Sequence, residues 1–134
     1  MTKSKEKRRS QKTVLVIDDD PKVRDLLQIV LCGSGYQVRI AKQSAEVLSI
    51  ALTPEEGIDL LLVDLYLPGI SGLDLADQVI SKCPETKVLY ISGISDAEDT
   101  KARAHGEWGK DASFLDKPFR PTQLVDSVDH LLGC

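Results

Sequence analysis

The apolar residues of this chain gather in short runs, separated by stretches with helical periodicity. Four runs are unbroken, which is typical of strands buried on both faces of a parallel sheet. A fifth run, residues 37–41, alternates apolar and polar side chains, as expected for a strand at a sheet edge. We therefore predict five strands. The four unbroken runs are residues 13–17, 59–63, 87–91 and 113–115.

Helical periodicity is clearest in the segment after the first strand, where five apolar residues recur at the spacing of one helix face. They are Val23, Leu26, Leu27, Val30 and Leu31. Asp20 suits the N-cap of this helix and Pro21 its first position, and "GSG" at 33–35 ends it. Further helical segments are expected at 44–52, 73–80, 96–105 and 124–131.

Strand and helix alternate five times along the chain, which is typical of an α/β three-layer domain with right-handed crossovers. Five such units favour a doubly wound, flavodoxin-like parallel sheet with the strand order 2-1-3-4-5, counted along the chain. The order reverses between the first and third strands of such a sheet. Ligands bind at this switch point, beyond the carboxyl ends of the strands.

Charge divides the chain of 134 residues into two parts. Residues 1–12 contain six Lys or Arg and one Glu, a net charge of +5, whereas the remainder carries a net charge of −9. We expect 1–12 to be a basic, disordered arm, because it has no apolar anchor, and 13–134 to be one folded domain. No run resembles a membrane span or a signal peptide, and the three cysteines lack metal-ligand spacing. These features predict a cytoplasmic protein without membrane contact.

Five polar residues stand where predicted strands end. Asp18 and Asp19 follow the first strand, Asp64 the third, Ser92 the fourth and Lys117 the fifth. The predicted fold brings these positions to one crevice at the switch point. Carboxylate oxygens without nearby imidazole or thiolate suit Mg²⁺. Together with a lysine and a hydroxyl, they indicate a phosphoryl-transfer site.

Each of these residues also has an ordinary structural interpretation. The cluster Asp18–Asp20 alone is more typical of a solvated helix start, because acidic residues favour helix N-termini. Ser92 alone would be a strand-end serine, and Lys117 a surface lysine before a proline. The occurrence of all of them at matching strand ends favours the site.

Four motifs resemble those of the receiver domains of two-component response regulators, over residues 13–133. They are "VLVIDDDP", "LLLVDLYLPGISG", "VLYISG" and "FLDKPF", in the order and near the spacing of that family. The resemblance implies that Asp64 is the phosphoacceptor. It also implies that Asp19 is a direct Mg²⁺ ligand, that Asp18 holds a metal-bound water, and that the backbone carbonyl of Tyr66 is a further ligand.

The resemblance assigns further roles at the other strand ends. Ser92 and Lys117 are expected to contact the phosphoryl group, Phe114 takes the position of the switch aromatic residue, and the Lys117–Pro118 bond is expected to be cis. The sequence departs from the family where Ser92 replaces the more usual Thr and Phe114 the more usual Tyr. Residues 105–112, which include the only tryptophan, form a slightly long segment.

The leading hypothesis is a module that accepts a phosphoryl group on Asp64 from a histidine kinase or phosphotransfer protein. We expect no turnover enzyme, since aspartyl phosphatases usually carry a second acid two residues after the nucleophile, where this chain has Tyr66. A passive receiver is the third alternative. The chain ends soon after its last predicted helix, so we expect output through a downstream protein contact and do not expect nucleic acid binding.

Overall fold

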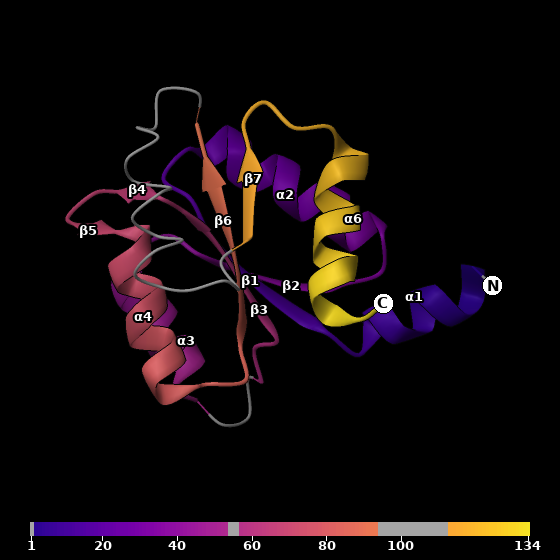
Figure 1. Ribbon diagram of the computed structural model, residues 1–134, viewed down its shortest axis with the longest axis horizontal. Helices are drawn as coiled ribbons and strands as arrows, with labels where there is room; N and C mark the ends of the chain where they lie inside the picture. Colours follow the sequence, from indigo (N-terminus) through magenta and orange to yellow (C-terminus); the bar gives the residue numbers. More distant parts are fainter. Residues whose placement is uncertain (1, 54–56, 94–112) are drawn as a thin grey trace.

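The computed structural model describes residues 2–53, 57–93 and 113–134. Its main sheet has five parallel strands in the order β2-β1-β3-β6-β7 (Figure 1). This is the predicted order 2-1-3-4-5, and the weakly apolar run at 37–41 is an edge strand as expected. The strands are β1 (Thr13–Ile17), β2 (Gln37–Ala41), β3 (Leu60–Asp64), β6 (Lys87–Ser92) and β7 (Ser113–Asp116).

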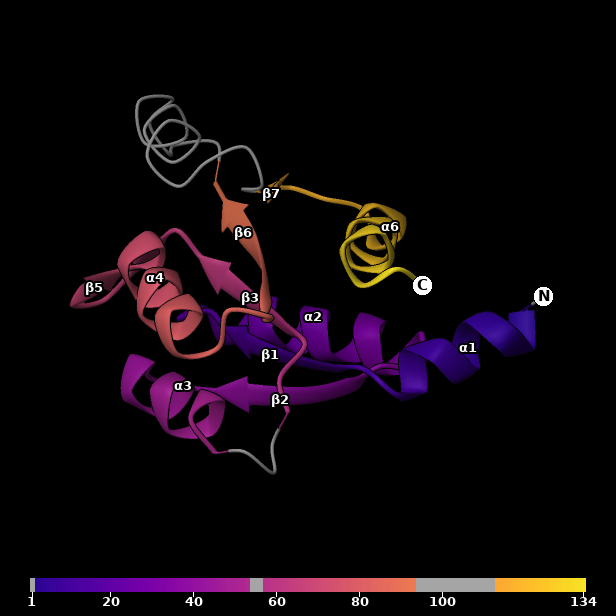
Figure 2. The same ribbon diagram turned by 60° about the horizontal axis from the view of Figure 1, so that its bottom comes forward.

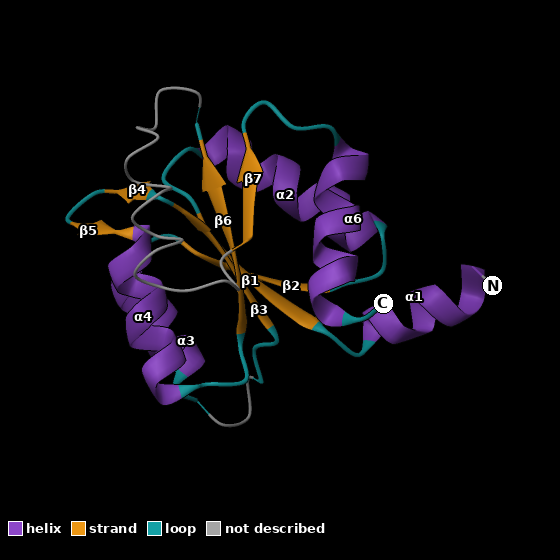
Figure 3. Cartoon of the chain, in the orientation of Figure 1, coloured by secondary structure: helices purple, strands orange, loops and turns teal. Residues whose placement is uncertain are grey.

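Helices cover both faces of this sheet, because alternate side chains of each buried strand point to opposite faces. Leu27 and Leu31 of α2 (Pro21–Gly33) share a core with Leu124 and Val128 of α6 (Pro121–Leu132). The other core contains buried residues of α3 (Ser44–Ala51) and α4 (Gly72–Lys82). Figures 2 and 3 show the resulting three layers, with the strands between the helices.

Helix α2 begins and ends where its sequence predicts. Asp20 is the N-cap, its carboxylate accepts a hydrogen bond from the Lys22 amide at 2.9 Å, and Pro21 is the first helical residue. The predicted apolar face is too wide, however, because Leu26 is 41% exposed. At 100° per residue, Leu26 lies about 120° around the helix from the midpoint between Leu27 and Leu31. It therefore points away from the sheet.

A small hairpin that the hydrophobic pattern did not predict follows β3. Strands β4 (Tyr66–Leu67) and β5 (Ile70–Ser71) pair antiparallel across Pro68 and Gly69. Gly69 has a φ of +81°, and proline followed by such a glycine is typical of a type II turn. The hairpin carries the chain directly from the end of β3 into α4.

The expectation of a disordered arm is wrong for Thr2–Ser10, which form the helix α1. Arg9 anchors it: its guanidinium donates to the two carboxylate oxygens of Asp129 on α6 at 3.0 and 2.7 Å, and to the Ser34 carbonyl at 3.2 Å. Figure 1 shows α1 beside the C-terminal end of α6. Sequence reasoning considered only apolar burial and so missed an ionic anchor. The boundary at residue 13 stays a prediction.

Two further expectations concern residues 96–105, predicted to be helical, and the segment 105–112 with Trp108. Both lie outside the described residues. The Lys117–Pro118 peptide bond is cis, as the family resemblance implied. All three cysteines are free thiols, in agreement with their spacing.

Asp129 joins α1, α6 and the turn before β2, because it also accepts a hydrogen bond from the hydroxyl of buried Tyr36. Asp129→Ala leaves two donors without their carboxylate, so we expect it to lower the free energy of unfolding by about 2 kcal/mol. Lys5→Ala is the control, because the Lys5 side chain is 42% exposed and its ion pair with Asp129 contributes less than about 1 kcal/mol. Urea unfolding measures both.

The same pair predicts a pH dependence. Burial tends to raise the pKa of Asp129, but the hydrogen bonds from Arg9 and Tyr36 outweigh it and hold the pKa below its ordinary value. The stabilisation is therefore present above about pH 4 and is lost as the pH falls through the lower pKa of the folded state. A wild-type advantage over Asp129→Ala that does not shrink in acid contradicts this assignment.

Candidate functional site

The carboxyl ends of the parallel strands bring the predicted site residues to one edge of the sheet. Asp18 and Asp19 directly follow β1, and Asp64 is the last residue of β3. Strands β1 and β3 are neighbours, and β2 lies on the other side of β1. The acidic residues therefore face each other at the switch point, where the strand order reverses.

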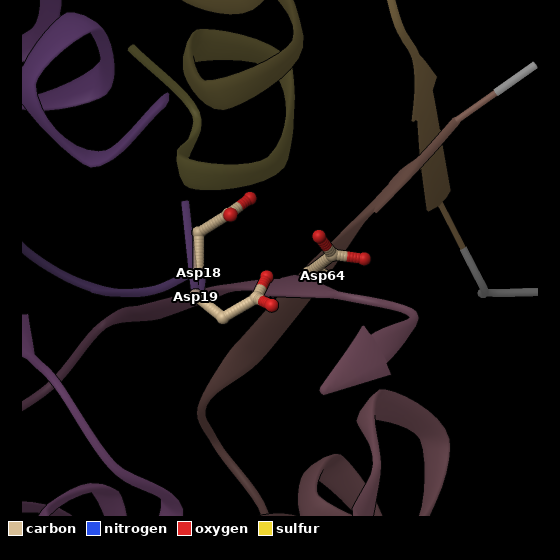
Figure 4. Close-up of side chains that lie close together, drawn as sticks. All are labelled: Asp18, Asp19 and Asp64. Atoms are coloured by element: carbon tan, nitrogen blue, oxygen red, sulfur yellow. The ribbon is translucent and has the colours of Figure 1, made fainter. Parts of the chain in front are cut away.

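Three carboxylates form a compact cluster here. One oxygen from each of Asp18, Asp19 and Asp64 lies within 4.8 Å of the others. Figure 4 shows the three side chains converging from the segment after β1 and from the end of β3. Asp18 is fully buried and Asp64 is 7% exposed, whereas Asp19 is open to solvent. The cluster thus combines two sheltered carboxylates with one accessible one.

Lys117 supplies a positive charge to this cluster. Its ammonium lies 3.2 Å from an oxygen of Asp64 and 3.4 Å from an oxygen of Asp18. Burial tends to lower the pKa of Lys117, but the two carboxylates outweigh it and raise the pKa above its ordinary value. Lys117 is therefore a cation that bridges the ends of β1 and β3.

Even with Lys117 beside it, Asp18 is in an unfavourable place for a negative charge. Burial raises its pKa to about 6, and the charge of Asp64 acts in the same direction. The Asp20 amide, which donates to Asp18 at 2.9 Å, and Lys117 compensate only in part. A second cation at this position would relieve the excess of negative charge.

The local backbone orients Asp64. One of its carboxylate oxygens accepts a hydrogen bond from the Tyr66 amide at 2.9 Å, and the other faces Lys117. Behind it, a Cβ on Gly72 would lie 2.1 Å from the Asp64 carbonyl oxygen, so only glycine fits at the start of α4. Sequence reasoning did not assign Gly72 this role, although its place in "GISG" was visible.

Ser92 is the last residue of β6, and Phe114 lies on the neighbouring strand β7. Ser92 is fully buried, but its hydroxyl donates to a carboxylate oxygen of Asp116 at 2.8 Å. Phe114 stacks on Tyr90, with ring centroids 5.3 Å apart and planes inclined by 29°. The structure thus unites the acidic cluster with Lys117, and it adds Asp116, a residue that the motif "FLDKPF" contains but that we did not single out.

The residues present fit a divalent cation of the Mg²⁺ type. The donors are hard carboxylate oxygens, two of them sheltered, and the burial of Asp18 makes an additional positive charge favourable. Tyr66, the first residue of β4, is half exposed. Its backbone carbonyl was expected to be a further ligand. Mg²⁺ keeps several waters, and a partly open carboxylate cluster allows this.

Comparison with known proteins shows the family of this chain. Residues 14–129 match the family described as "Response regulator receiver domain". The chain belongs to this family. As a receiver domain of two-component systems it is a signalling module, and such domains are generally not enzymes.

Several relatives share this domain. The chain is 35% identical over 123 residues to the transcriptional regulatory protein AruR of Pseudomonas aeruginosa, covering 89% of this chain and 48% of that protein. It is 32% identical over 117 residues to the DNA-binding response regulator MtrA of Mycolicibacterium smegmatis, covering 86% and 48%. The receiver domain therefore spans about half the length of these curated relatives.

Solved structures agree with the fold. A CheY-like receiver domain protein from Methanospirillum hungatei superimposes with a TM-score of 0.80 at 27% identity, over 91% of this chain and 94% of that one. A response regulator from Chloroflexus aurantiacus gives 0.77 at 33% identity, over 92% and 98%. Within the described ranges, the helices are too short or too polar to cross a membrane.

The raised pKa of Asp18 predicts a trade-off between stability and metal binding. The pKa is about 6 in the folded state and about 4 in an unfolded chain. As the pH rises through this interval, the unfolded state loses the proton first, so the fold loses stability between about pH 4 and pH 6, and the loss is complete above pH 6. We expect Asp18→Asn to raise the melting temperature of the metal-free protein at pH 8 by roughly 3–6 °C.

With Mg²⁺ added, we expect the wild type to melt at a higher temperature than Asp18→Asn, because the variant lacks a carboxylate of the proposed metal site. Thermal melts with and without Mg²⁺, at pH 4.5 and pH 8, measure both effects. Asp25→Asn, which removes an exposed charge on α2, is the matched control. An Asp18→Asn protein that gains as much as the wild type from Mg²⁺ contradicts a metal role for Asp18.

Proposed function

We propose that this receiver domain accepts a phosphoryl group on Asp64 from the phosphohistidine of a histidine kinase or phosphotransfer protein. Mg²⁺ takes part, and the signal is passed on through a protein–protein contact in the cytoplasm. One observation carries the proposal: an oriented carboxylate ends β3 at the switch point, with Lys117 on one of its oxygens and two further carboxylates beside it. This is the arrangement that phosphoryl transfer to a carboxylate needs.

In the proposed transfer, an oxygen of Asp64 forms a bond to phosphorus while the bond from phosphorus to the donor imidazole nitrogen breaks. That nitrogen keeps the electron pair and is reprotonated from solvent. Lys117 keeps its contact with Asp64 and offsets the negative charge of the phosphoryl oxygens. Asp19 would bind the metal ion directly and Asp18 would hold a water bound to it, and the ion would supply Lewis-acid charge. The hydroxyl of Ser92 is proposed as a further donor to the phosphoryl group.

A Mg²⁺-dependent phosphatase with an aspartyl nucleophile is the enzymatic alternative. It requires an acid to protonate the leaving group, usually two residues after the nucleophile. Tyr66 occupies that place, and its phenol is half exposed on β4. This favours a stoichiometric acceptor over a turnover enzyme. A passive receiver is disfavoured because acceptor, cation and acidic cluster are all in contact.

The output of the protein is proposed to be a contact with another protein. Two curated relatives have names that refer to DNA binding or transcription, but this chain matches only about half of each. The activities that these names state are therefore not transferred to the receiver domain. For the receiver itself, the proposed partners are the phosphoryl donor and an as yet unidentified downstream protein.

Asp64 is expected to be the sole phosphoacceptor, and the reaction is expected to require a divalent metal. Incubation with Mg²⁺ and a small phosphodonor, followed by intact-mass spectrometry, should add one phosphoryl group to the wild type and none to Asp64→Ala. Asp74→Ala removes an exposed carboxylate on α4 and should label normally. Equal labelling of Asp64→Ala, or full labelling in excess EDTA, contradicts the proposal.

Tyr66 is expected to slow the loss of the phosphoryl group. It lies two residues after Asp64, where we expect it to border the path by which water attacks from the side opposite the carboxylate, and it has no carboxylate or amide to orient that water. Tyr66→Asn should speed hydrolysis about tenfold, equivalent to roughly 1.4 kcal/mol in the barrier.

The decay of the phosphorylated protein, followed by mass spectrometry after removal of the donor, measures this effect. Tyr66→Phe is the matched control, because it keeps the ring and removes only the hydroxyl. It should decay like the wild type. An unchanged or slower rate for Tyr66→Asn shows that Tyr66 does not control access of water.

A further inference from the structure

Two successive side-chain pairs join β6 to β7 on the same face of the sheet. The strands are parallel, with Tyr90 opposite Phe114 and Ser92 opposite Asp116. The first pair is the aromatic stack, and the second is the hydrogen bond of 2.8 Å from the Ser92 hydroxyl to Asp116. Residues two apart on a strand share a face, so the hydrogen-bonded pair lies directly beyond the stack, toward the proposed phosphorylation site.

We propose that Asp116 is a positioning residue that holds the Ser92 hydroxyl away from Asp64 in the resting state. A phosphoryl group on Asp64 must then compete with Asp116 for this hydroxyl. Asp116 thereby sets the balance between the resting and the phosphoryl-bound arrangements of the receiver. This inference rests on the proposed function, because it concerns the group that Asp64 accepts.

The donor capacities of the two side chains support the competition. A serine hydroxyl has one proton, so it serves one strong acceptor at a time. Lys117 has three, and it can keep contact with Asp64 and Asp18 while it also reaches a phosphoryl oxygen. Ser92 is therefore the residue that has to exchange its acceptor when the site is filled.

Burial decides which partner can move. Ser92 is fully buried at the end of β6, and its backbone carbonyl accepts the Lys117 amide at 2.7 Å, so the main chain around it is held. We therefore expect the exchange to occur by rotation of the Ser92 side chain. Asp116 is solvent-exposed, so water can take the place of the hydroxyl on its carboxylate. The hydrogen bond is charge-assisted, so Asp116 competes significantly with a phosphoryl group for the Ser92 hydroxyl. When the bond breaks, the Asp116 carboxylate is solvated by water and no buried polar group loses its partner.

The test is the affinity of the full chain for beryllofluoride in the presence of Mg²⁺, measured by fluorine NMR, since this anion mimics a phosphoryl group on a carboxylate. Asp116→Ala frees the Ser92 hydroxyl and should tighten binding by about threefold to tenfold. Asp116→Asn removes the charge but keeps an oxygen acceptor, and should have a smaller effect. Because Asp116 is exposed, both variants are expected to fold, and circular dichroism checks this.

A double-mutant cycle separates positioning from simple charge removal. In a Ser92→Ala background, Asp116→Ala and Asp116→Asn should give the same small change, because only through-space charge remains. A tightening by Asp116→Ala that is equally large without the Ser92 hydroxyl overturns the proposal, and so does weaker binding. A wild type that phosphodonors label on Asp64, but whose beryllofluoride affinity ignores Asp116, overturns this inference alone. A wild type that neither labels nor binds beryllofluoride overturns the proposed function as well.

Discussion

The ammonium of Lys117 between the carboxylates of Asp18 and Asp64 is the interaction on which the site depends. It joins the ends of β1 and β3, two strands that are neighbours in space but far apart in sequence. Without a cation, two sheltered carboxylates at one strand edge would repel each other and be driven toward protonation. Lys117 compensates only in part, as the raised pKa of Asp18 shows. The resting site is therefore folded but still short of positive charge.

Backbone geometry places this charge cluster. The carboxylate of Asp64 is held by the amide of Tyr66, and the turn at Gly69 returns the chain so that Gly72 packs on the Asp64 carbonyl. No side chain can be inserted there without displacing the backbone of Asp64. The same short hairpin also sets where Tyr66 lies. The orientation of Asp64 and the position of Tyr66 are thus determined by one connection between β3 and α4.

The two ends of the sheet are stabilised in different ways. At the carboxyl ends, the charges are incompletely balanced, and the donor Ser92 is paired with Asp116 in a contact that can be exchanged. At the opposite end, Asp129 is satisfied by Arg9 and Tyr36, and α1 is anchored to the body. The paired charges around Asp129 and the incompletely balanced charges at the carboxyl ends of the strands can coexist in one domain. The apolar cores between the two ends are filled by strand and helix side chains.

The sequence by itself determined the layers, the strand order and the acidic and basic residues of the site. Unbroken apolar runs indicate buried parallel strands, and the carboxyl ends of such strands share one edge, so the pattern alone places Asp18, Asp64 and Lys117 together. Only the tertiary structure decided three features: the acceptor of the Ser92 hydroxyl, the close approach of Gly72 to the Asp64 carbonyl, and the formation of helix α1. These depend on pairs of polar or backbone atoms within a few ångströms, and hydrophobic periodicity carries no information about them. In the sequence, Arg9 is one of several basic residues expected to be solvated. The fold places Asp129 opposite it, and the two side chains pair.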